Sequence, residues 1–181
     1  MNGLEIRESI TEDTEEMNLI NKLSWDESYS GILSAVDWKE RRKWQEEIYS
    51  AKKSKSLVAI MDDKIVGYCN LGPMRTAEDM ESWVSHSSFK GDEEEWGEIY
   101  AIYVQKSYSR LGIGKALFEK AKEAIGALGY EQFQVYTLEQ NLPAIHFYRR
   151  MNGLVEVTRD WSHSGKTYKE IGMVFYINNT N

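Results

Sequence analysis

The sequence predicts a mixed α+β fold, and three observations lead to this fold class. Alternating or continuous apolar segments, typical of strands, occur in both halves of the chain. Longer segments with apolar residues at helical spacing lie between them. Near the centre, a strand, a glycine-containing helix and a second strand follow one another over residues 98–138, which is a strand–helix–strand unit. With 181 residues, we expect one domain over residues 1–181 that buries about 70% of its unfolded surface.

The first part of the chain predicts one strand and two helices. Residues 4–8 alternate between apolar and charged side chains, as a half-buried strand does. Thr11 is a candidate N-cap for a helix whose apolar residues recur at helical spacing as far as Leu23. Residues 24–31 combine Ser, Asp, Glu and Gly and are expected to form a loop. A second helix is expected from about Ala35 to Ala51.

The middle of the chain predicts a hairpin, a polar segment and a strong strand. Residues 57–61 and 65–71 are largely apolar and flank the polar residues 62–64, a pattern typical of a β-hairpin. Residues 73–96 are polar and rich in Asp and Glu. Residues 98–104, Glu-Ile-Tyr-Ala-Ile-Tyr-Val, then predict the central strand.

The last part of the chain alternates helices and strands. A helix is expected from Gly112, with apolar residues on one face as far as Leu128, and Gly129 is suited to end it. A strand follows over residues 133–138, and a short helix over residues 142–151. The chain then predicts two final strands and the loop that joins them, over residues 154–160, 168–177 and 162–166 respectively.

Composition and charge exclude several function classes. The net charge is −7, whereas binding to a phosphate backbone requires clustered Lys and Arg, so we expect no nucleic-acid partner. The negative charge is compatible with a cationic small partner, and equally with a role in solubility alone. No apolar run approaches the roughly 20 residues of a membrane span, and the N-terminal segment lacks the apolar core of a signal peptide. With one cysteine, no disulfide forms within the chain and a cytoplasmic location is expected.

The most informative motif is a pair of glycines at the start of the helix that follows the central strand. Gly112 and Gly114 are flanked by the basic residues Arg110 and Lys115. A helix N-terminus presents unpaired backbone N–H groups and a partial positive charge. Glycines let an anion approach these groups without a Cβ in the way. Residues 111–115 therefore predict a cradle for a phosphate or pyrophosphate, which indicates a nucleotide-type cofactor.

Two familiar phosphate-binding motifs fit this segment poorly. A P-loop requires Ser or Thr after Gly-Lys, but Ala116 follows Lys115, so a magnesium ion would lack its hydroxyl ligand. A dinucleotide-binding Gly-x-Gly-x-x-Gly motif has its first two glycines here, but Leu117 stands at the third position. Residues 105–111 also separate the strand from the first glycine, whereas that motif follows its strand almost at once.

A third motif accounts for this spacer. Residues 103–117 resemble the coenzyme A motif of the GNAT superfamily of N-acetyltransferases, Gln/Arg-x-x-Gly-x-Gly/Ala after an apolar strand and a short loop. Ser109 stands at the Gln/Arg position, and neighbouring Arg110 is suited to supply the cation. Residues 141–153 resemble a second segment of the superfamily, Asn-x-x-Ala-x-x-Phe-Tyr ending in Gly. The separation of the two blocks and the order of elements over residues 4–177 also fit.

The resemblance implies a fold, a co-substrate and a reaction. The fold is a twisted, mostly antiparallel central sheet of about six to seven strands, flanked by about four helices. The co-substrate is acetyl-CoA, and the reaction is acetyl transfer to a primary amine of a small molecule or peptide by direct attack in a ternary complex. No metal and no membrane partner are expected, and a homodimer is compatible with the fold. The alternative is a non-catalytic acyl-CoA-binding sensor or interaction module on the same fold.

The chemistry of amine acetylation calls for a proton acceptor and a proton donor. A lysine-like amine has a pKa of about 10.4, so removing its proton near pH 7 costs roughly 4–5 kcal/mol. Glu98, at the start of the central strand, is the candidate base, directly or through water. A solvated carboxylate at a strand end fits Glu98 equally well, and Glu95 and Tyr100 are nearby alternatives. Tyr148 matches the tyrosine that the superfamily places near the CoA sulfur, and is the candidate acid because a phenol with a pKa near 10 can protonate a leaving thiolate.

The remaining candidate residues divide between the two substrates. Asn141 is expected either to contact the pantetheine arm or to cap the helix that follows it. Trp25 and Tyr29 lie in the predicted loop 24–31, which in GNAT folds walls the acceptor site, and with Tyr100 they are candidate acceptor-binding residues. The residues expected to bind acetyl-CoA are Ile102, Tyr103, Val104, Ser109, Arg110, Leu111, Gly112, Ile113, Gly114, Lys115, Asn141, Ala144 and Phe147.

Overall fold

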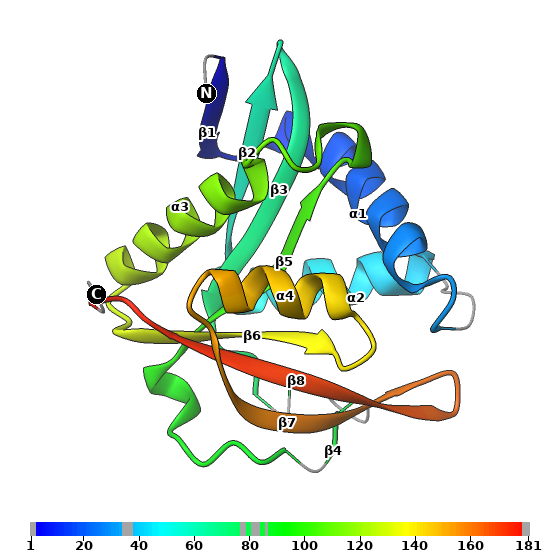
Figure 1. The fold of residues 1–181 in the computed structure, drawn as a ribbon, viewed down its shortest axis with the longest axis vertical. Helices are drawn as coiled ribbons and strands as arrows, with labels where there is room; N and C mark the ends of the chain where they lie inside the picture. The colour runs from blue at the N-terminus through cyan, green and yellow to red at the C-terminus, as the bar shows by residue number, and fades with distance from the viewer. Residues whose placement is uncertain (1–2, 34–37, 77–78, 81–83, 86, 179–181) are drawn as a thin grey trace.

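The computed structural model describes residues 3–33, 38–76, 79–80, 84–85 and 87–178. These residues form four α-helices and one eight-stranded sheet (Figure 1). The helices are α1 (Thr14–Tyr29), α2 (Trp38–Ala51), α3 (Ile113–Ala127) and α4 (Leu142–Arg150). The strands are β1 (Leu4–Glu8), β2 (Lys55–Met61), β3 (Lys64–Pro73), β4 (Val84–Ser85), β5 (Gly97–Val104), β6 (Gln132–Leu138), β7 (Leu154–His163) and β8 (Lys166–Tyr176).

The sheet confirms the predicted mixed α+β class. Its strand order is β1-β2-β3-β5-β6-β8-β7-β4. Every neighbouring pair is antiparallel except β5 and β6, which are parallel. The two-residue strand β4 was not predicted, because it lies in the acidic segment 73–96, whose composition is untypical of strands.

Strands β5 and β6 pair over a short stretch and then diverge. Gly97–Ile99 of β5 pair with Phe133–Val135 of β6, whereas β5 continues to Val104. In Figure 1, β1, β2, β3 and β5 stand upright while β6, β8 and β7 lie across them. Beyond Ile99, the edge of β5 that faces β6 therefore has no ladder partner, and its N–H and C=O groups need partners elsewhere.

A β-bulge falls at the point of divergence. The register of β5 against β3 shifts by one residue, so that Tyr100 has no partner on β3 although Ile99 and Ala101 do. Bulges bend a strand and re-aim its side chains. Gly72 on β3 makes room for the ring that is re-aimed, since a Cβ at Gly72 would lie 2.6 Å from the Tyr100 hydroxyl.

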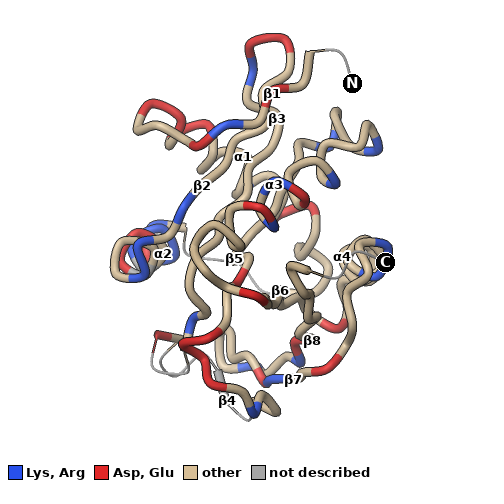
Figure 2. The backbone as a smooth tube through the Cα atoms, turned by 90° about the vertical axis from the view of Figure 1, so that its left-hand side faces the viewer, with Lys and Arg blue, Asp and Glu red and all other residues tan. Residues whose placement is uncertain are grey.

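Helices cover both faces of the sheet. Figure 2 shows α2 and α4 on opposite sides of β5 and β6. Alternation along β2 illustrates how one strand serves both layers. Leu57 and Ala59 belong to the core that includes α3 and α4, whereas Val58 packs with Ile20 of α1.

A cluster of aromatic rings packs α3 and α4 against the sheet. Phe118 of α3 is 1% exposed. The centre of its ring lies 4.9 Å from that of Phe175 on β8 and 6.2 Å from that of Phe147 on α4. Phe133 of β6 stacks on Phe175 at 4.9 Å. Because such pairs contribute beyond the area that they bury, this cluster holds both helices in one core.

Helix α1 begins and ends later than predicted. Thr11, its predicted cap, lies in the 3-10 turn Thr11–Asp13, and α1 begins at Thr14. The predicted loop over residues 24–31 is wrong, because α1 continues to Tyr29. The buried residues of α1 recur at helical spacing, so the buried face outweighs the polar composition that suggested a loop; they are Ile20, Asn21, Trp25 and Tyr29.

The turn between β7 and β8 is tighter than the predicted loop around residues 162–166. The two strands extend to His163 and from Lys166, so Ser164 and Gly165 alone join them. Both of these residues have positive φ, as a two-residue hairpin turn of type I′ requires.

The predicted start of the second helix, at Ala35, lies outside the described residues, and α2 is described from Trp38.

We expect Phe118→Ala to lower the free energy of unfolding by about 3–5 kcal/mol, because it removes a fully packed ring and leaves a cavity between α3, α4 and the sheet. Chemical denaturation followed by circular dichroism measures this change. Leu154→Ala, at a residue that is 52% exposed, is the matched control and should change the value by no more than about 0.5 kcal/mol. Equal effects of the two substitutions would contradict this account of the core.

Candidate active site

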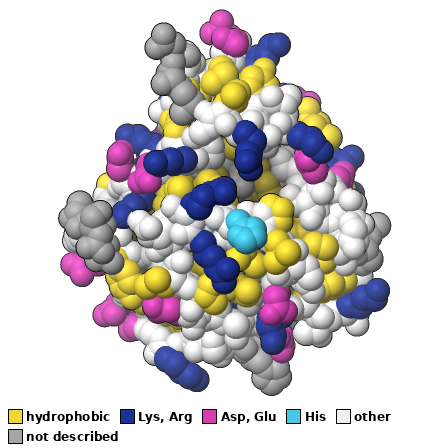
Figure 3. Space-filling view, in the orientation of Figure 1, with side chains coloured by type: hydrophobic (Ala, Val, Ile, Leu, Met, Phe, Trp, Pro, Cys, Tyr) yellow, Lys and Arg dark blue, Asp and Glu magenta, His cyan; other side chains and the backbone are white. Residues whose placement is uncertain are grey.

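The first of three neighbouring cavities, which we call the α3 cavity, lies at the N-terminus of α3 and has a volume of about 660 Å³. Gly112 precedes the helix with φ +82°, a left-handed conformation that favours glycine. The backbone hydrogen bond from Ala116 N–H to the Gly112 carbonyl starts the helix, so the N–H groups of residues 113–115 precede the helical ladder. Figure 3 shows Lys and Arg side chains on the face that carries α3 and α4. The cationic residues that line the cavity are Arg110, Lys115 and Arg150.

The space around Gly114 indicates whether this cavity can accommodate a phosphate group. A Cβ at Gly114 would lie 3.5 Å from the ring of Phe147, an ordinary van der Waals distance, so packing within the protein does not require glycine here. Gly114 instead lines both the α3 cavity and the cavity next to it. Free N–H groups, three cations and an open approach over a glycine fit a phosphate or pyrophosphate.

The second cavity, which we call the channel, has a volume of about 330 Å³ and runs between α1, β5 and α4. It follows the edge of β5 that lost its partner at Ile99. Unpaired backbone groups on a strand edge can bind an extended ligand as an added strand would. The predicted acetyl-CoA and catalytic residues that line the channel are Ile102, Tyr103, Val104, Ser109, Gly114, Ala144, Phe147 and Tyr148.

Tyr148 lines the channel from α4 and is 6% exposed. Its ring packs against those of Phe147, at 5.2 Å, and Phe175, at 6.3 Å. Burial raises the pKa of the Tyr148 phenol well above 10, and the groups that also influence it, Cys69 and two tyrosines, are neutral. The phenol therefore stays protonated at neutral pH.

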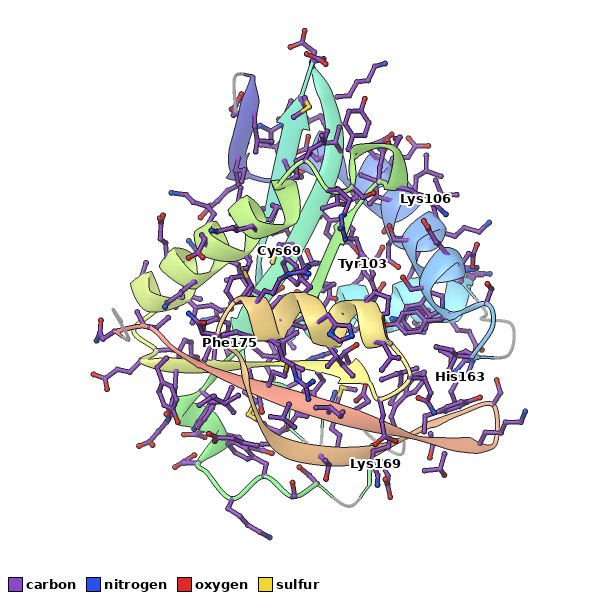
Figure 4. All side chains as sticks on the ribbon, in the orientation of Figure 1. Cys69, Tyr103, Lys106, His163, Lys169 and Phe175 are labelled. Atoms are coloured by element: carbon purple, nitrogen blue, oxygen red, sulfur yellow. The ribbon has the colours of Figure 1, made fainter. Side chains whose placement is uncertain are left out.

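The third cavity, which we call the aromatic cavity, has a volume of about 80 Å³ and lies between α1, α2 and the strands β5 to β8. Successive residues of a strand point to opposite faces. Ala101 and Tyr103 of β5 line this cavity, whereas Ile102 and Val104 line the channel. Tyr103 lines both cavities, and Figure 4 labels it on β5, in the region bordered by α1 and α4. The three predicted acceptor residues also line the aromatic cavity: Trp25, Tyr29 and Tyr100.

Glu98, the candidate base, lines none of these three cavities. Its side chain is fully buried, and the carboxylate accepts hydrogen bonds from the Arg75 guanidinium at 2.5 Å and from the Arg75 backbone N–H at 2.8 Å. Burial alone lowers the pKa of Arg75, but the charge of Glu98 and its hydrogen bonds more than offset this, so the pKa is raised. The role of Glu98 as base stays a prediction, and this ion pair gives its carboxylate no direct access to a substrate.

Three residues predicted to bind acetyl-CoA line neither the α3 cavity nor the channel. Asn141 accepts a hydrogen bond from Ala144 N–H at 3.2 Å and donates one to the Tyr29 hydroxyl at 3.1 Å, so it caps α4 and joins it to α1. The side chain of Ile113 is buried in the core. Leu111 is 50% exposed. For Ile113 and Leu111, it is therefore the backbone, and not the side chain, that can face an anion at the helix N-terminus.

Apart from Arg110, the arginines of these cavities were not predicted. Arg41 comes from α2, Arg75 from the segment after β3, and Arg159 from β7, and all three line the aromatic cavity. In the sequence they resemble residues of solvated surfaces, because nothing local brings three distant segments together. Arg150 of the α3 cavity is different, since it follows Phe147 by three residues on α4. Helical spacing alone puts these two side chains on the same face.

No group of three or more His, Cys, Asp or Glu side chains among the described residues is arranged to hold a metal ion. None of the helices in that part of the chain combines the length and the apolar character of a bilayer span.

Comparison with known proteins agrees with this geometry. The model of the acetyltransferase (GNAT) family matches residues 17–154. A curated relative, the uncharacterized N-acetyltransferase YuaI of Bacillus subtilis strain 168, is 26% identical over 176 residues, which are 93% of this chain and 90% of that protein.

Solved structures share the fold at lower identity. The PaiA N-acetyltransferase of Thermoplasma acidophilum in complex with coenzyme A has a TM-score of 0.68 and 21% identity, and the match covers 96% of this chain and 98% of that chain. The ribosomal-protein-alanine N-acetyltransferase of Brucella melitensis has a TM-score of 0.69 and 19% identity, with 95% and 99% covered. Because the family model spans most of the sequence and the surrounding fold is shared, the chain belongs to the GNAT family and is an acyltransferase that uses acetyl-CoA as its co-substrate.

Proposed function

We propose that this acyltransferase transfers the acetyl group of acetyl-CoA to a primary amine of a small molecule by direct attack, with both substrates bound at once. One observation carries this proposal: the channel and the aromatic cavity approach β5 from opposite sides and share Tyr103. An acetyl group at the inner end of the channel would meet an amine that enters from the aromatic cavity. A non-catalytic CoA sensor would need only the first of these two cavities.

A covalent acetyl-enzyme is disfavoured by the chemistry of Cys69. It is the one cysteine of the chain, and its side chain is fully buried on β3. Burial raises the pKa of the Cys69 thiol, so the reactive thiolate is suppressed. Direct attack of the amine on the thioester needs no acetyl-cysteine intermediate. It requires only that the two reactants be held close together in the correct orientation.

We assign the proton donor for the leaving CoA thiolate to Tyr148. The residue lines the channel near Ala144 and Phe147, and its raised pKa keeps the phenol protonated. The unpaired edge of β5 and the α3 cavity are suited to hold the pantetheine arm and the pyrophosphate of acetyl-CoA respectively. Any backbone N–H that points at the acetyl carbonyl oxygen would stabilise the negative charge that develops on this oxygen during the reaction.

The acceptor amine needs no buried carboxylate to lose its proton. Glu98 is neutralised by Arg75, and Glu170, the acidic residue that lines the aromatic cavity, is neutralised by Arg159 at 2.6 Å. With its lining carboxylate already paired, the cavity offers no free anion among the described residues to stabilise an ammonium group. Removal from water disfavours the charged ammonium and lowers its pKa, so the amine is delivered as the nucleophilic free base.

Gly114→Ala is expected to weaken coenzyme A binding at least tenfold, because its Cβ fills the approach that the α3 cavity and the channel share. Isothermal titration calorimetry with coenzyme A measures the dissociation constant. The melting temperature should not fall, since the nearest protein atom lies 3.5 Å from the new Cβ. Gly126→Ala, later on the same helix, is the control and should leave binding unchanged. An unaltered affinity in the Gly114 variant would overturn the assignment of the cradle.

Tyr148→Phe is expected to lower kcat by about 10²-fold or more while leaving the KM for acetyl-CoA within about twofold, because the ring still packs and only the proton donor is lost. In the unaltered enzyme the rate should show no alkaline decline below about pH 10, since the competent form of Tyr148 is the neutral phenol and burial raises its pKa. Thiol release from acetyl-CoA over pH 6–10 measures both. Tyr130→Phe, at a residue away from the channel, is the control, and an equally small effect of the two variants would refute the assignment.

Glu98→Gln separates the two roles open to this carboxylate. If Glu98 serves to hold Arg75, the substitution leaves a buried guanidinium without its counter-charge and lowers the free energy of unfolding by about 3–5 kcal/mol. The double variant Glu98→Gln with Arg75→Met should then recover most of that stability. Chemical denaturation measures the stability and thiol release measures the activity. A stable Glu98→Gln variant with a loss of kcat above about 10²-fold would instead identify Glu98 as the base.

A further inference from the structure

The charges that line the aromatic cavity indicate what the acceptor carries besides its amine. Arg41, Arg75, Arg159 and Glu170 line it. Arg75 pairs with Glu98 at 2.5 Å and Arg159 with Glu170 at 2.6 Å. Among the described residues no carboxylate lies within ion-pair distance of Arg41, so it is the one guanidinium of this cavity without a carboxylate partner there.

Arg41 is held in place as a ready-made anion site. Its guanidinium lies 3.7 Å from the centre of the Trp25 ring, a contact that fixes its orientation. Its Nε–H group is buried and has no hydrogen-bond partner in the described part of the chain. A buried donor without a partner is costly, and a bound anion would satisfy it.

The cavity also holds an unused hydrogen-bond acceptor. Asn21 is 7% exposed and donates its amide N–H to the Tyr68 hydroxyl at 2.5 Å, while its Oδ1 atom is buried and has no partner among the residues that the structure describes. Tyr68 packs on Tyr103, with ring centres 5.8 Å apart, so Asn21 lies near the junction with the channel. The hydroxyl groups of Tyr136 and Thr137, which also line the cavity, are likewise buried without a hydrogen-bond partner among the described residues. Partnerless acceptors together with a guanidinium on α2 that has no carboxylate partner match an amine and an anion on the same small molecule.

From this charge pattern we infer that the acceptor is a compact amine that also carries a carboxylate, as an amino acid does, with the carboxylate bound by Arg41. The inference rests on the proposed function, since it names the acceptor of the same site. A polyamine is disfavoured because Glu170, the carboxylate that lines the cavity, is already paired with Arg159. A doubly charged phosphate would need more than one free cation. The cavity of about 80 Å³ holds only several water-sized groups, which excludes a bulky acceptor end.

The test compares amino acids with their primary amides, each pair having the same side chain and differing in the carboxylate. Thiol release is measured at saturating acetyl-CoA for several such pairs and for spermidine. We expect kcat/KM to be at least tenfold higher for the amino acid of each accepted pair. The amide has the less basic amine and is more often unprotonated at pH 8, so reactivity alone works against the expected result.

Variants at Arg41 identify the group responsible. Arg41→Met is expected to lower kcat/KM for the amino acids 10- to 100-fold while leaving the amides within threefold, and Arg41→Lys should keep part of the preference. Lys43→Met removes the same charge from an exposed residue of α2 and should change neither. Melting temperatures and coenzyme A affinities of all variants show whether the fold and the co-substrate site are intact.

The outcomes separate this inference from the proposed function. Acetylation of amides or of spermidine as efficiently as of amino acids would overturn the inference and leave amine acetylation standing. A preference for amino acids that survives in Arg41→Met would overturn the assignment of Arg41 as the carboxylate site. Coenzyme A binding without thiol release from any amine would overturn the proposed function itself, and the inference with it.

Discussion

The early end of the β5–β6 ladder is the constraint on which the rest of the site depends. A parallel pair that continued to Val104 would have paired every backbone group and packed the two strands side by side. Because pairing stops at Ile99, β5 keeps one free edge and presents alternate side chains to two separate cavities. The bulge at Tyr100 falls at this point, and α4 crosses the gap on one side while α1 and α2 close it on the other (Figures 1 and 2).

The buried charged residues determine the electrostatic potential in the aromatic cavity. A guanidinium or carboxylate that is as deeply buried as Arg75, Glu98 or Arg159 is expected to be paired, because desolvation of a single ion exceeds what one hydrogen bond returns. Arg75 with Glu98 and Arg159 with Glu170 meet this requirement and cancel one another. The aromatic rings around them are neutral, since burial raises the pKa of Tyr100, Tyr103 and Tyr136. The sign of the cavity is therefore set by Arg41.

Local patterns predicted the fold and most of the residues that line the α3 cavity and the channel, whereas the arginines of the aromatic cavity are brought together by long-range packing. The glycines of residues 111–115 and the position of Tyr148 one turn before a helix end are visible in short segments of sequence. Trp25 and Tyr29 were recognised as aromatic wall residues but assigned to a loop, because composition was weighed above helical spacing. The contact of Arg75 with Glu98 spans 23 residues and joins a loop to a strand, and no periodicity encodes such a pair.

The proposed function assigns the two substrates to different elements of the fold. The co-substrate side is lined by α3, α4 and one edge of β5, and we propose that backbone groups make its main contacts, which side-chain substitutions hardly alter. The acceptor side is built from side chains of α1, α2, β7 and β8, whose identities can change without disturbing the glycine cradle. Tyr103 is the residue that borders both. Under the proposed function, a substitution at a position such as Arg41 of α2 would change the preferred acceptor and leave the glycine cradle in place.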